Sequence, residues 1–360
     1  MADPYFLQAC PGHNSTSGNF ECINPLQEAQ WDSLIAQCPG AGIFHSAAWA
    51  RVLHDTYQFE PTYFSDIDAM ECTAVLPVME VDSGITGRRG VSLPFSDECA
   101  AIGSDVSRIN LVSAVLNHGK TRRWKYCDFH GGKHLFAGAV ASCSFWGHRL
   151  ELTSDITSLF GSFHSSARRA IRKAEQSRVT VEFSTTLKAV RSFYEMFCHT
   201  RKKHGIPPQP WRFFENIQRH VLASDQGFVA LARHAGAHIA GAIFFCFGKT
   251  SLLKFSASDF TFQHLRGNNL VMWNAIRRMA QNGISSLDLG RTSLSNEGLR
   301  HFKLSWGTRE RLVEYVRYDH RVGQFVQLAD KATGWHTIML RHFPTPLFRL
   351  IGSIIYRHTA

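Results

Sequence analysis

Three residues that could do chemistry, Asp288, Gly290 and Arg291, stand close together at the end of a short apolar run. A carboxylate in such a place can accept a proton from an attacking amine. A guanidinium can hold a phosphate or a carboxylate through two parallel hydrogen bonds. The ammonium of Lys303 follows a little further along and could stabilise negative charge that develops in a reaction. Transfer of a group to an amine needs little more than such positioning, charge stabilisation and removal of one proton.

Each of these side chains also has a structural alternative. Asp288 could instead accept a hydrogen bond from the turn that follows it. Arg291 could form an ion pair with Asp288 or Glu297. Lys303 could be a solvated lysine on a loop.

The elements around these residues can be predicted from apolar spacing. The pattern after Asn268 predicts a helix with one apolar face, which ends at Gly283. Ile284–Leu289 is short and mostly apolar, as expected of a buried strand. A polar loop and the element Phe302–Gly307 follow, in which Phe302 and Trp306 flank Lys303. We therefore expect the backbone at Lys303 to be held firmly and its ammonium to face a cleft.

The helix, the Asp288-Leu289-Gly290-Arg291 turn and the Phe302-Lys303-Leu304-Ser305-Trp306-Gly307 element resemble the FemAB-like branch of the GNAT acyltransferase superfamily. The resemblance extends from about Phe44 to Tyr318. That branch includes the bacterial aminoacyltransferases that build peptidoglycan cross-bridges and relatives associated with exopolysaccharide operons. The resemblance implies an α/β (α+β) fold of two tandem GNAT-like lobes, with mixed sheets flanked by helices. It also supports a catalytic role for Lys303, because the cross-bridge enzymes keep a lysine at this place. We expect Asp288 to be the second catalytic residue and expect substrate contacts from Arg291, Gly290 and Trp306.

The acyl donor stays open at this stage. GNAT enzymes hold coenzyme A phosphates at a helix N-terminus, in a loop of the form Q/R-x-x-G-x-G/A. The candidate donor-binding residues here depart from that form, because an arginine stands at the first glycine position; they are Gln263, Arg266, Gly267, Asn268 and Asn269. The alternative is an ordinary loop before an Asn-capped helix. We expect no permanently bound cofactor, and either aminoacyl-tRNA or acyl-CoA as donor.

The order of elements repeats along the chain. Three strand-like runs, a helix and a further strand lead to Asp288, and the same order leads to Asp128, about 160 residues earlier. A period of this length predicts a duplicated domain. The predicted organisation is a flexible arm (1–24), a first lobe (25–160), a second lobe with the active cleft (161–335) and an amphipathic tail (336–360).

Charge and composition restrict the partners. The chain has 360 residues, a net charge of +10 and 44% hydrophobic residues, which is typical of globular proteins. Such a charge favours anionic partners, among them lipid- or nucleotide-linked cell-envelope precursors and tRNA, although it could also be solvated surface. The nine cysteines show no CxxC spacing and no signal peptide opens the chain, so we expect a cytoplasmic protein.

Two further segments have open interpretations. The basic stripe of Arg168, Arg169 and Arg172 could bind a pyrophosphate or a nucleic-acid backbone, or could be a solvated helix face. The apolar tail Phe343–Tyr356 is too short to span a bilayer and could lie on the inner face of a membrane or dock on the second lobe. His130 and His134 have no ligand series near them, so no metal site is expected.

The function that we predict is transfer of an acyl or aminoacyl group to an amine of a cell-envelope acceptor, either a peptidoglycan precursor or a polysaccharide. The first alternative is an acyl-CoA-dependent N-acetyltransferase that acts on an amino sugar or a small amine. The second is a basic binding module for RNA or anionic lipid without catalysis.

Overall fold

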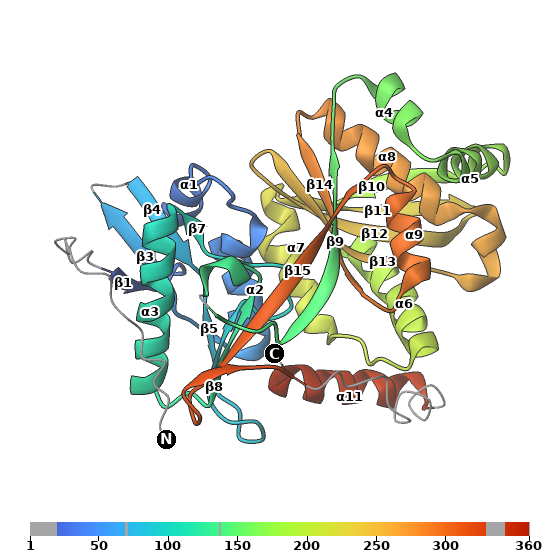
Figure 1. Cartoon of the computed structure of the whole chain (residues 1–360). Helices are drawn as coiled ribbons and strands as arrows, with labels where there is room; N and C mark the ends of the chain where they lie inside the picture. The colour runs from blue at the N-terminus through green and yellow to red at the C-terminus, as the bar shows by residue number, and fades with distance from the viewer. Residues whose placement is uncertain (1–19, 69–70, 137, 329–342, 360) are drawn as a thin grey trace.

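The computed structural model describes residues 20–68, 71–136, 138–328 and 343–359, and it has two lobes that lie side by side (Figure 1). The first lobe contains β1 (Phe20–Ile23), α1 (Trp31–Ile35), η1 (Ile43–His45), α2 (Ala47–Tyr57), β2 (Glu60–Pro61), β3 (Tyr63–Asp68), β4 (Glu71–Leu76), β5 (Met79–Val81), β6 (Arg89–Ser92), β7 (Ile102–Gly103), α3 (Asp105–Thr121), β8 (Tyr126–His130), η2 (Lys133–Leu135) and β9 (Cys143–Glu151).

The second lobe contains α4 (Ile156–Ser162), α5 (Ser165–Gln176), β10 (Thr180–Ser184), α6 (Leu187–His204), α7 (Trp211–His220), η3 (Leu222–Ser224), β11 (Gly227–His234), β12 (Ala237–Phe247), β13 (Thr250–Ser258), η4 (Phe260–Leu265), α8 (Gly267–Gln281), β14 (Ser286–Ser293), α9 (Glu297–Leu304), β15 (Arg309–Asp319) and β16 (Gln324–Val326). A last helix, α11 (Thr345–His358), lies below the second lobe in Figure 1.

One large mixed sheet joins the lobes. Its strand order is β10-β11-β12-β13-β14-β9-β15-β8-β6-β5-β2, so β9 of the first lobe lies between β14 and β15, and β15 of the second lobe lies between β9 and β8. The lobes therefore exchange one strand each. Mixed sheets with helices on their faces confirm the predicted fold class. The predicted boundary near residue 160 stays a prediction.

The two lobes have corresponding strand pairs at their centres. In the second lobe β13 runs parallel to β14 with α8 between them in the chain, and in the first lobe β6 runs parallel to β8 with α3 between them. β14 then pairs antiparallel with β9, and β8 pairs antiparallel with β15. Asp288 and Asp128 are each the third residue of the corresponding strands β14 and β8.

The structure differs from the predicted elements in two places of the first lobe. Residues 1–19 of the predicted arm lie outside the described residues, but Phe20–Ile23 of that arm form β1, which pairs with β3. One of the three strand-like runs that precede Asp128, residues 73–81, is divided at Pro77 into β4 and β5, which belong to different sheets. Proline has no N–H to donate to a ladder, so a strand commonly ends there.

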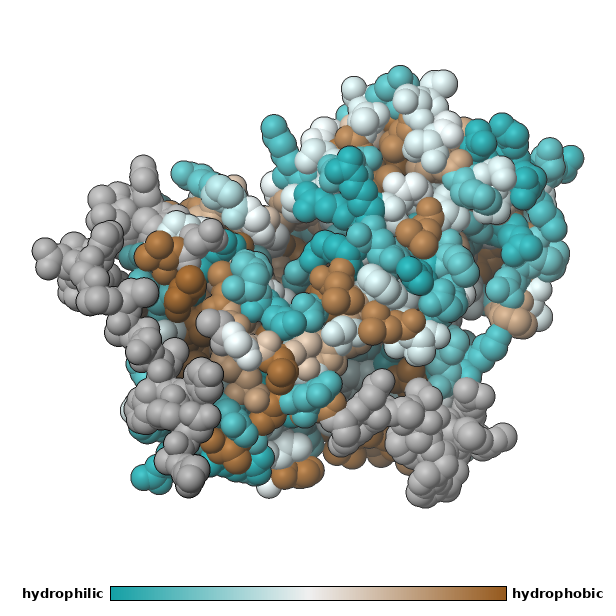
Figure 2. All heavy atoms as spheres, in the orientation of Figure 1, coloured by the Kyte–Doolittle hydropathy of each residue, from teal (hydrophilic) through white to brown (hydrophobic). Residues whose placement is uncertain are grey.

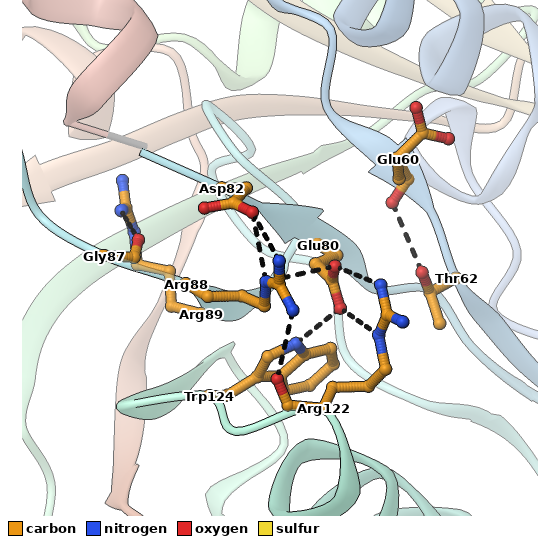
Figure 3. Close-up of polar contacts among 9 residues, drawn as sticks. All are labelled: Glu60, Thr62, Glu80, Asp82, Gly87, Arg88, Arg89, Arg122 and Trp124. Carbon is orange, nitrogen blue, oxygen red and sulfur yellow. Dashed lines mark hydrogen bonds and ion pairs between the residues drawn. The ribbon is translucent and has the colours of Figure 1, made fainter. Parts of the chain in front are cut away.

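A buried carboxylate joins separate elements of the first lobe through hydrogen bonds (Figure 3). Glu80 on β5 accepts hydrogen bonds from Arg122 Nε at 3.0 Å and from Trp124 Nε1 at 2.7 Å. Burial alone would raise the pKa of Glu80, but these donors lower it below its ordinary value. Arg88 extends the network to Asp82 at 2.7 Å. The network joins β5 to the turn between α3 and β8.

Helix α11 is docked, which was one of the two alternatives for the tail. Phe348 is fully buried, and a Cβ on Gly352 would lie 2.0 Å from Pro208 O, so the helix fits closely against the loop after α6. Tyr356 OH donates to Pro207 O at 3.0 Å. The end of the helix also contacts the first lobe, where Arg89 donates to His358 O at 2.8 Å.

Candidate active site

The site lies where β13 and β14 separate. The two strands pair from Thr250–Leu252 to Ser286–Asp288, and a bulge then interrupts the pairing of β14 with β9 between Asp288 and Arg291. Gly290 has φ +70°, a conformation that glycine adopts without steric cost. The predicted strand ended at Leu289, whereas β14 continues through this bulge to Ser293.

A cleft of about 490 Å³ lies over this point, between one face of the sheet and the first-lobe segments 39–45 and 97–102. Alternation along β14 turns Ser286, Asp288 and Gly290 to the cleft, while Leu287 and Leu289 pack on the α8 side. The charged side chains that line the cleft are Asp97, Glu98, Arg108, Arg149, Asp288, Arg291 and Arg311. Both lobes thus contribute to one cavity.

A second cavity, of about 630 Å³, lies between α1 and the ends of β11 and β12. Its lining includes Asp225, Cys246 and Arg278. We place the candidate site in the smaller cavity, because that cavity brings together Asp288, Gly290 and Arg291.

Asp288 is the carboxylate in the cleft that is best suited to accept a proton. Its Oδ1 accepts a hydrogen bond from Gly290 N at 2.6 Å, which is the turn contact considered as its structural alternative. Its Oδ2 is 4.0 Å from Arg311 Nη2. Burial raises the pKa of Asp288 to about 6, with a smaller contribution from Asp97. A carboxyl that titrates near neutral pH is suited to accept a proton.

Arg291 is held by aromatic side chains. Its Nη1 donates to Tyr315 OH at 2.6 Å, and its guanidinium lies 4.4 Å from the centre of the Phe145 ring. Tyr315 OH in turn donates to Asp97 O at 2.6 Å. This arrangement differs from the ion pair with Asp288 or Glu297 considered as an alternative, and it leaves the guanidinium at the cleft wall.

Lys303 lies beneath the bulge. It is on α9, its side chain is 5% exposed, and Nζ donates to Gly290 O at 2.8 Å and to Arg291 O at 3.1 Å. Burial lowers the pKa of Lys303 to about 8, while Asp97 and Asp288 oppose that effect. The ammonium therefore fixes the backbone of the bulge, whereas the sequence predicted that it would face the cleft.

Trp306 supports this arrangement from the core. It is fully buried, and its ring lies 5.1 Å from that of Phe163 and 6.0 Å from that of Phe302. The structure therefore places the predicted substrate contact in the apolar layer behind the site.

The predicted donor-binding residues lie at the start of α8, on the sheet face opposite the cleft. Arg266 has φ +59° and is the N-cap residue, without a side-chain hydrogen bond to the helix, so the Asn cap considered as an alternative is not formed. A Cβ on Gly267 would lie 3.1 Å from Ile239 Cδ1, so this end of α8 packs closely on β12. Gln263 belongs to η4, and Asn268 and Asn269 to the first turn of α8. This end of α8 stays a candidate anion site.

The basic stripe lies apart from the cleft. Arg168, Arg169 and Arg172 are on α5, whose buried residues pack in the same core layer as α8. Figure 2 shows a largely hydrophilic surface where α5 lies. His130 is half-buried and stacks on Tyr315 with ring centres 4.2 Å apart. No group of three or more metal-ligating side chains occurs among the described residues.

Sequence reasoning missed Lys254 of the second lobe and its first-lobe partner Asp97. Lys254, at a bulge of β13, donates to Asp97 Oδ2 at 2.9 Å and to Phe95 O at 2.5 Å. The side chain of Lys254 is 6% exposed. The only sequence signal was a single lysine within an apolar run, which gave no indication of its partner.

The comparisons with known proteins agree with this architecture. Residues 161–304 match the model of the acetyltransferase (GNAT) domain family. FemX is similar over 92% of this chain and 99% of its own, with a TM-score of 0.65 and 14% identity. A tandem GNAT protein from the clavulanic acid biosynthesis pathway is similar over 83% of this chain and 98% of its own, with a TM-score of 0.53 and 10% identity.

A third similar structure is the C-terminal domain of an Agrobacterium fabrum protein described as a lysylphosphatidylglycerol synthetase. It covers 88% of this chain and 94% of its own, with a TM-score of 0.54 and 14% identity. No match was found among curated proteins. Together the findings show a GNAT domain in residues 161–304 and an overall fold shared with FemX and with a tandem GNAT protein.

Proposed function

We propose that this protein transfers an acyl or aminoacyl group to a primary amine of an anionic cell-envelope precursor, in the cleft between the lobes. The observation that carries the proposal is Asp288, a carboxyl with a pKa of about 6 that faces a cavity lined by arginines. The carboxylate would receive the amine proton, and the arginines would hold an anionic part of the acceptor. The names of FemX and of a lysylphosphatidylglycerol synthetase among the similar structures support this class of acceptor.

In the proposed reaction the acceptor nitrogen attacks the donor carbonyl carbon. A new C–N bond forms, the C–O bond of an aminoacyl-tRNA or the C–S bond of an acyl-CoA breaks, and the nitrogen loses one proton to Asp288. Arg291, held by Tyr315, would bind an anionic group of the acceptor. Lys303 would act through the backbone, because it fixes the carbonyls of the bulge that carries Gly290.

We propose that the donor approaches from the α8 side of the sheet. Backbone N–H groups at the start of α8 would face a phosphate there, near Gln263 and Arg266. The basic face of α5 could continue such a surface for a longer polyanion, which would suit aminoacyl-tRNA. The GNAT domain match and the tandem GNAT protein favour acyl-CoA as the second candidate donor.

A donor panel tests the proposal. Acetyl-CoA, longer acyl-CoA thioesters and charged tRNA would be incubated with amino sugars and with peptidoglycan precursors, and acylated amine would be detected by mass spectrometry. Product from one donor class identifies the donor, and a donor at 100 times its dissociation constant should raise the unfolding free energy by about 2.7 kcal/mol. Absence of both product and stabilisation across the panel would contradict the proposal.

We also propose that α11 contacts the inner face of the membrane. Its outer side exposes apolar residues, with Leu350 55% and Ile354 54% exposed, although its inner side is docked. Arg357 stands in its last turn, and such a basic, apolar face suits an anionic lipid surface. Among the described residues, no helix has the length and apolar character needed to cross a membrane.

Leu350→Asp and Ile354→Asp should each reduce sedimentation with phosphatidylglycerol vesicles by about tenfold or more, because each removes roughly 1.5–3 kcal/mol of apolar burial. The melting temperature should change little, since both side chains face outward. The matched control is Ile109→Asp on α3, where the side chain is 51% exposed. Equal sedimentation of all variants and the unmodified protein would contradict membrane contact through α11.

A further inference from the structure

The exchanged strands place an arginine opposite the corresponding aspartate in both lobes. Arg149 on β9 is the cross-strand partner of Asp288 on β14. Arg317 on β15 is the cross-strand partner of Asp128 on β8. Residues directly opposite in an antiparallel pair have Cβ atoms about 4.5–5.5 Å apart, so either guanidinium can reach the carboxylate across from it.

In the first lobe the arginine and the aspartate form a direct ion pair. Arg317 donates to Asp128 from Nε at 2.5 Å and from Nη2 at 2.6 Å. Its guanidinium also lies 3.9 Å from the centre of the Tyr126 ring, two residues before Asp128. The nearest competing carboxylate on its own strand, Asp319, is occupied by Arg321 Nη2 at 2.5 Å. Arg317 thus has its acceptor in Asp128 and blocks that carboxylate, although burial keeps the pKa of Asp128 above its ordinary value while Arg317 lowers it.

In the second lobe the equivalent arginine is turned away from the aspartate. Arg149 Nη2 donates to Ser286 Oγ at 2.9 Å, and its Nε lies 3.4 Å from Glu151 Oε1. Ser286 stands two residues before Asp288, where the first lobe has Tyr126. Glu151 stands two residues after Arg149, where the first lobe has Asp319. Two substituted positions therefore give Arg149 acceptors other than the aspartate opposite it.

We propose that Ser286 and Glu151 are positioning residues that hold Arg149 away from Asp288, and so keep this carboxylate available to the cleft, whereas Arg317 closes the equivalent carboxylate of the first lobe. The contrast assigns acid–base chemistry to one of two copies of the same strand arrangement. Its consequence for catalysis rests on the proposed function, but the arginine position and the titration of Asp288 do not.

Other charged groups also face Asp288. Asp97 and Glu98 come from the first-lobe segment, Arg311 from β15 at 4.0 Å, and Lys303 from α9. Arg311 is held by Glu98, to which it donates from both terminal nitrogens. Burial and the carboxylates of Asp97 and Glu98 keep the pKa of Asp288 raised. A second guanidinium in contact with Asp288 would therefore lower this pKa.

The test is a titration of Asp288 by carbon NMR in protein labelled with ¹³C at aspartate carboxyl groups, with Asp288→Asn for assignment. The double variant Ser286→Ala/Glu151→Gln removes the hydroxyl acceptor of Arg149 and the negative charge of its second partner. We expect the pKa of Asp288 to fall from about 6 toward its ordinary range in this variant. Adding Arg149→Gln should restore the raised pKa, which a general disturbance of the strand would not do.

The matched control is Ser285→Ala/Glu182→Gln. Ser285 neighbours Ser286 but donates to Lys249 O, and Glu182 pairs with Arg233 on another strand pair. This control should leave the titration of Asp288 unchanged. An unchanged pKa in Ser286→Ala/Glu151→Gln, or an equal fall in the control, would overturn the proposal. Because no donor or acceptor is present, failure of the proposed acyl transfer would leave this result unaffected.

Discussion

Replacement of Asp288 by asparagine is expected to lower the turnover number for acyl transfer by ~10²–10⁴-fold, the usual contribution of a positioned general base. The amide keeps the size of the side chain and can still accept a hydrogen bond from Gly290 N, so the bulge should persist. Turnover would be measured with the donor found in the panel, at saturating acceptor.

The same variant should be more stable than the unmodified protein at pH 8. Because the folded-state pKa of Asp288 is about 6 against an ordinary value of 3.8, the folded state holds this proton more tightly than the unfolded state. The stability that this carboxyl contributes is therefore lost as the pH rises from about 3.8 through about 6, so the full cost is present at pH 8 and asparagine removes it. Lower activity with lower melting temperature at pH 8 would instead indicate a structural role.

Asp128→Asn provides the contrast in the other lobe. It leaves Arg317 without its partner, so the protein should lose stability, on the order of 3 kcal/mol. Turnover of the folded fraction should stay near that of the unmodified protein. A large loss of turnover in Asp128→Asn, with Asp288→Asn near normal, would move the active cleft to the first lobe.

Replacement of Lys303 by alanine is the second large effect. Two backbone carbonyls, Gly290 O and Arg291 O, would lose their donor, so we expect a loss of stability of about 1–3 kcal/mol. We also expect turnover to fall by ~10²–10³-fold, because the bulge that carries Gly290 would no longer be fixed beside Asp288. Both quantities would be measured on the same preparation.

Lys303→Met separates the effect of side-chain volume from the effect of the charge and the hydrogen bonds of Lys303. It keeps most of the side-chain volume and removes the charge and the donors. Because methionine cannot donate to the two carbonyls, the methionine variant should recover neither stability nor turnover. If it recovers both, Lys303 only fills space, and its assignment to the site is wrong.

The parts of the fold that follow from local pattern could be predicted from the sequence. Helix α8 and strand β14 have clear periodicity, and the repeat that leads to Asp128 and Asp288 indicated two lobes. The exchange of β9 and β15 could not be predicted, because strand pairing between segments far apart in the chain depends on packing rather than on local propensity.

The same distinction applies to the site. Asp288, Gly290 and Arg291 are neighbours in the chain, so their proximity was visible at once. Asp97 and Arg149 reach the site from the first lobe, and no spacing connects them with Asp288. Burial of Lys303 was also hidden, because a lysine that donates to two carbonyls has the same sequence pattern as one that faces solvent.

The dependence of kcat/KM on pH in the unmodified protein tests the central claim most directly. If Asp288 is the proton acceptor and Lys303 must carry its charge, the profile should be bell-shaped, with an acid limb near pH 6 and a basic limb near pH 8. The rate should fall below pH 6 as Asp288 becomes protonated and above pH 8 as Lys303 loses its proton. A profile that is flat from pH 5 to pH 9, or an acid limb that persists unchanged in Asp288→Asn, would contradict the account.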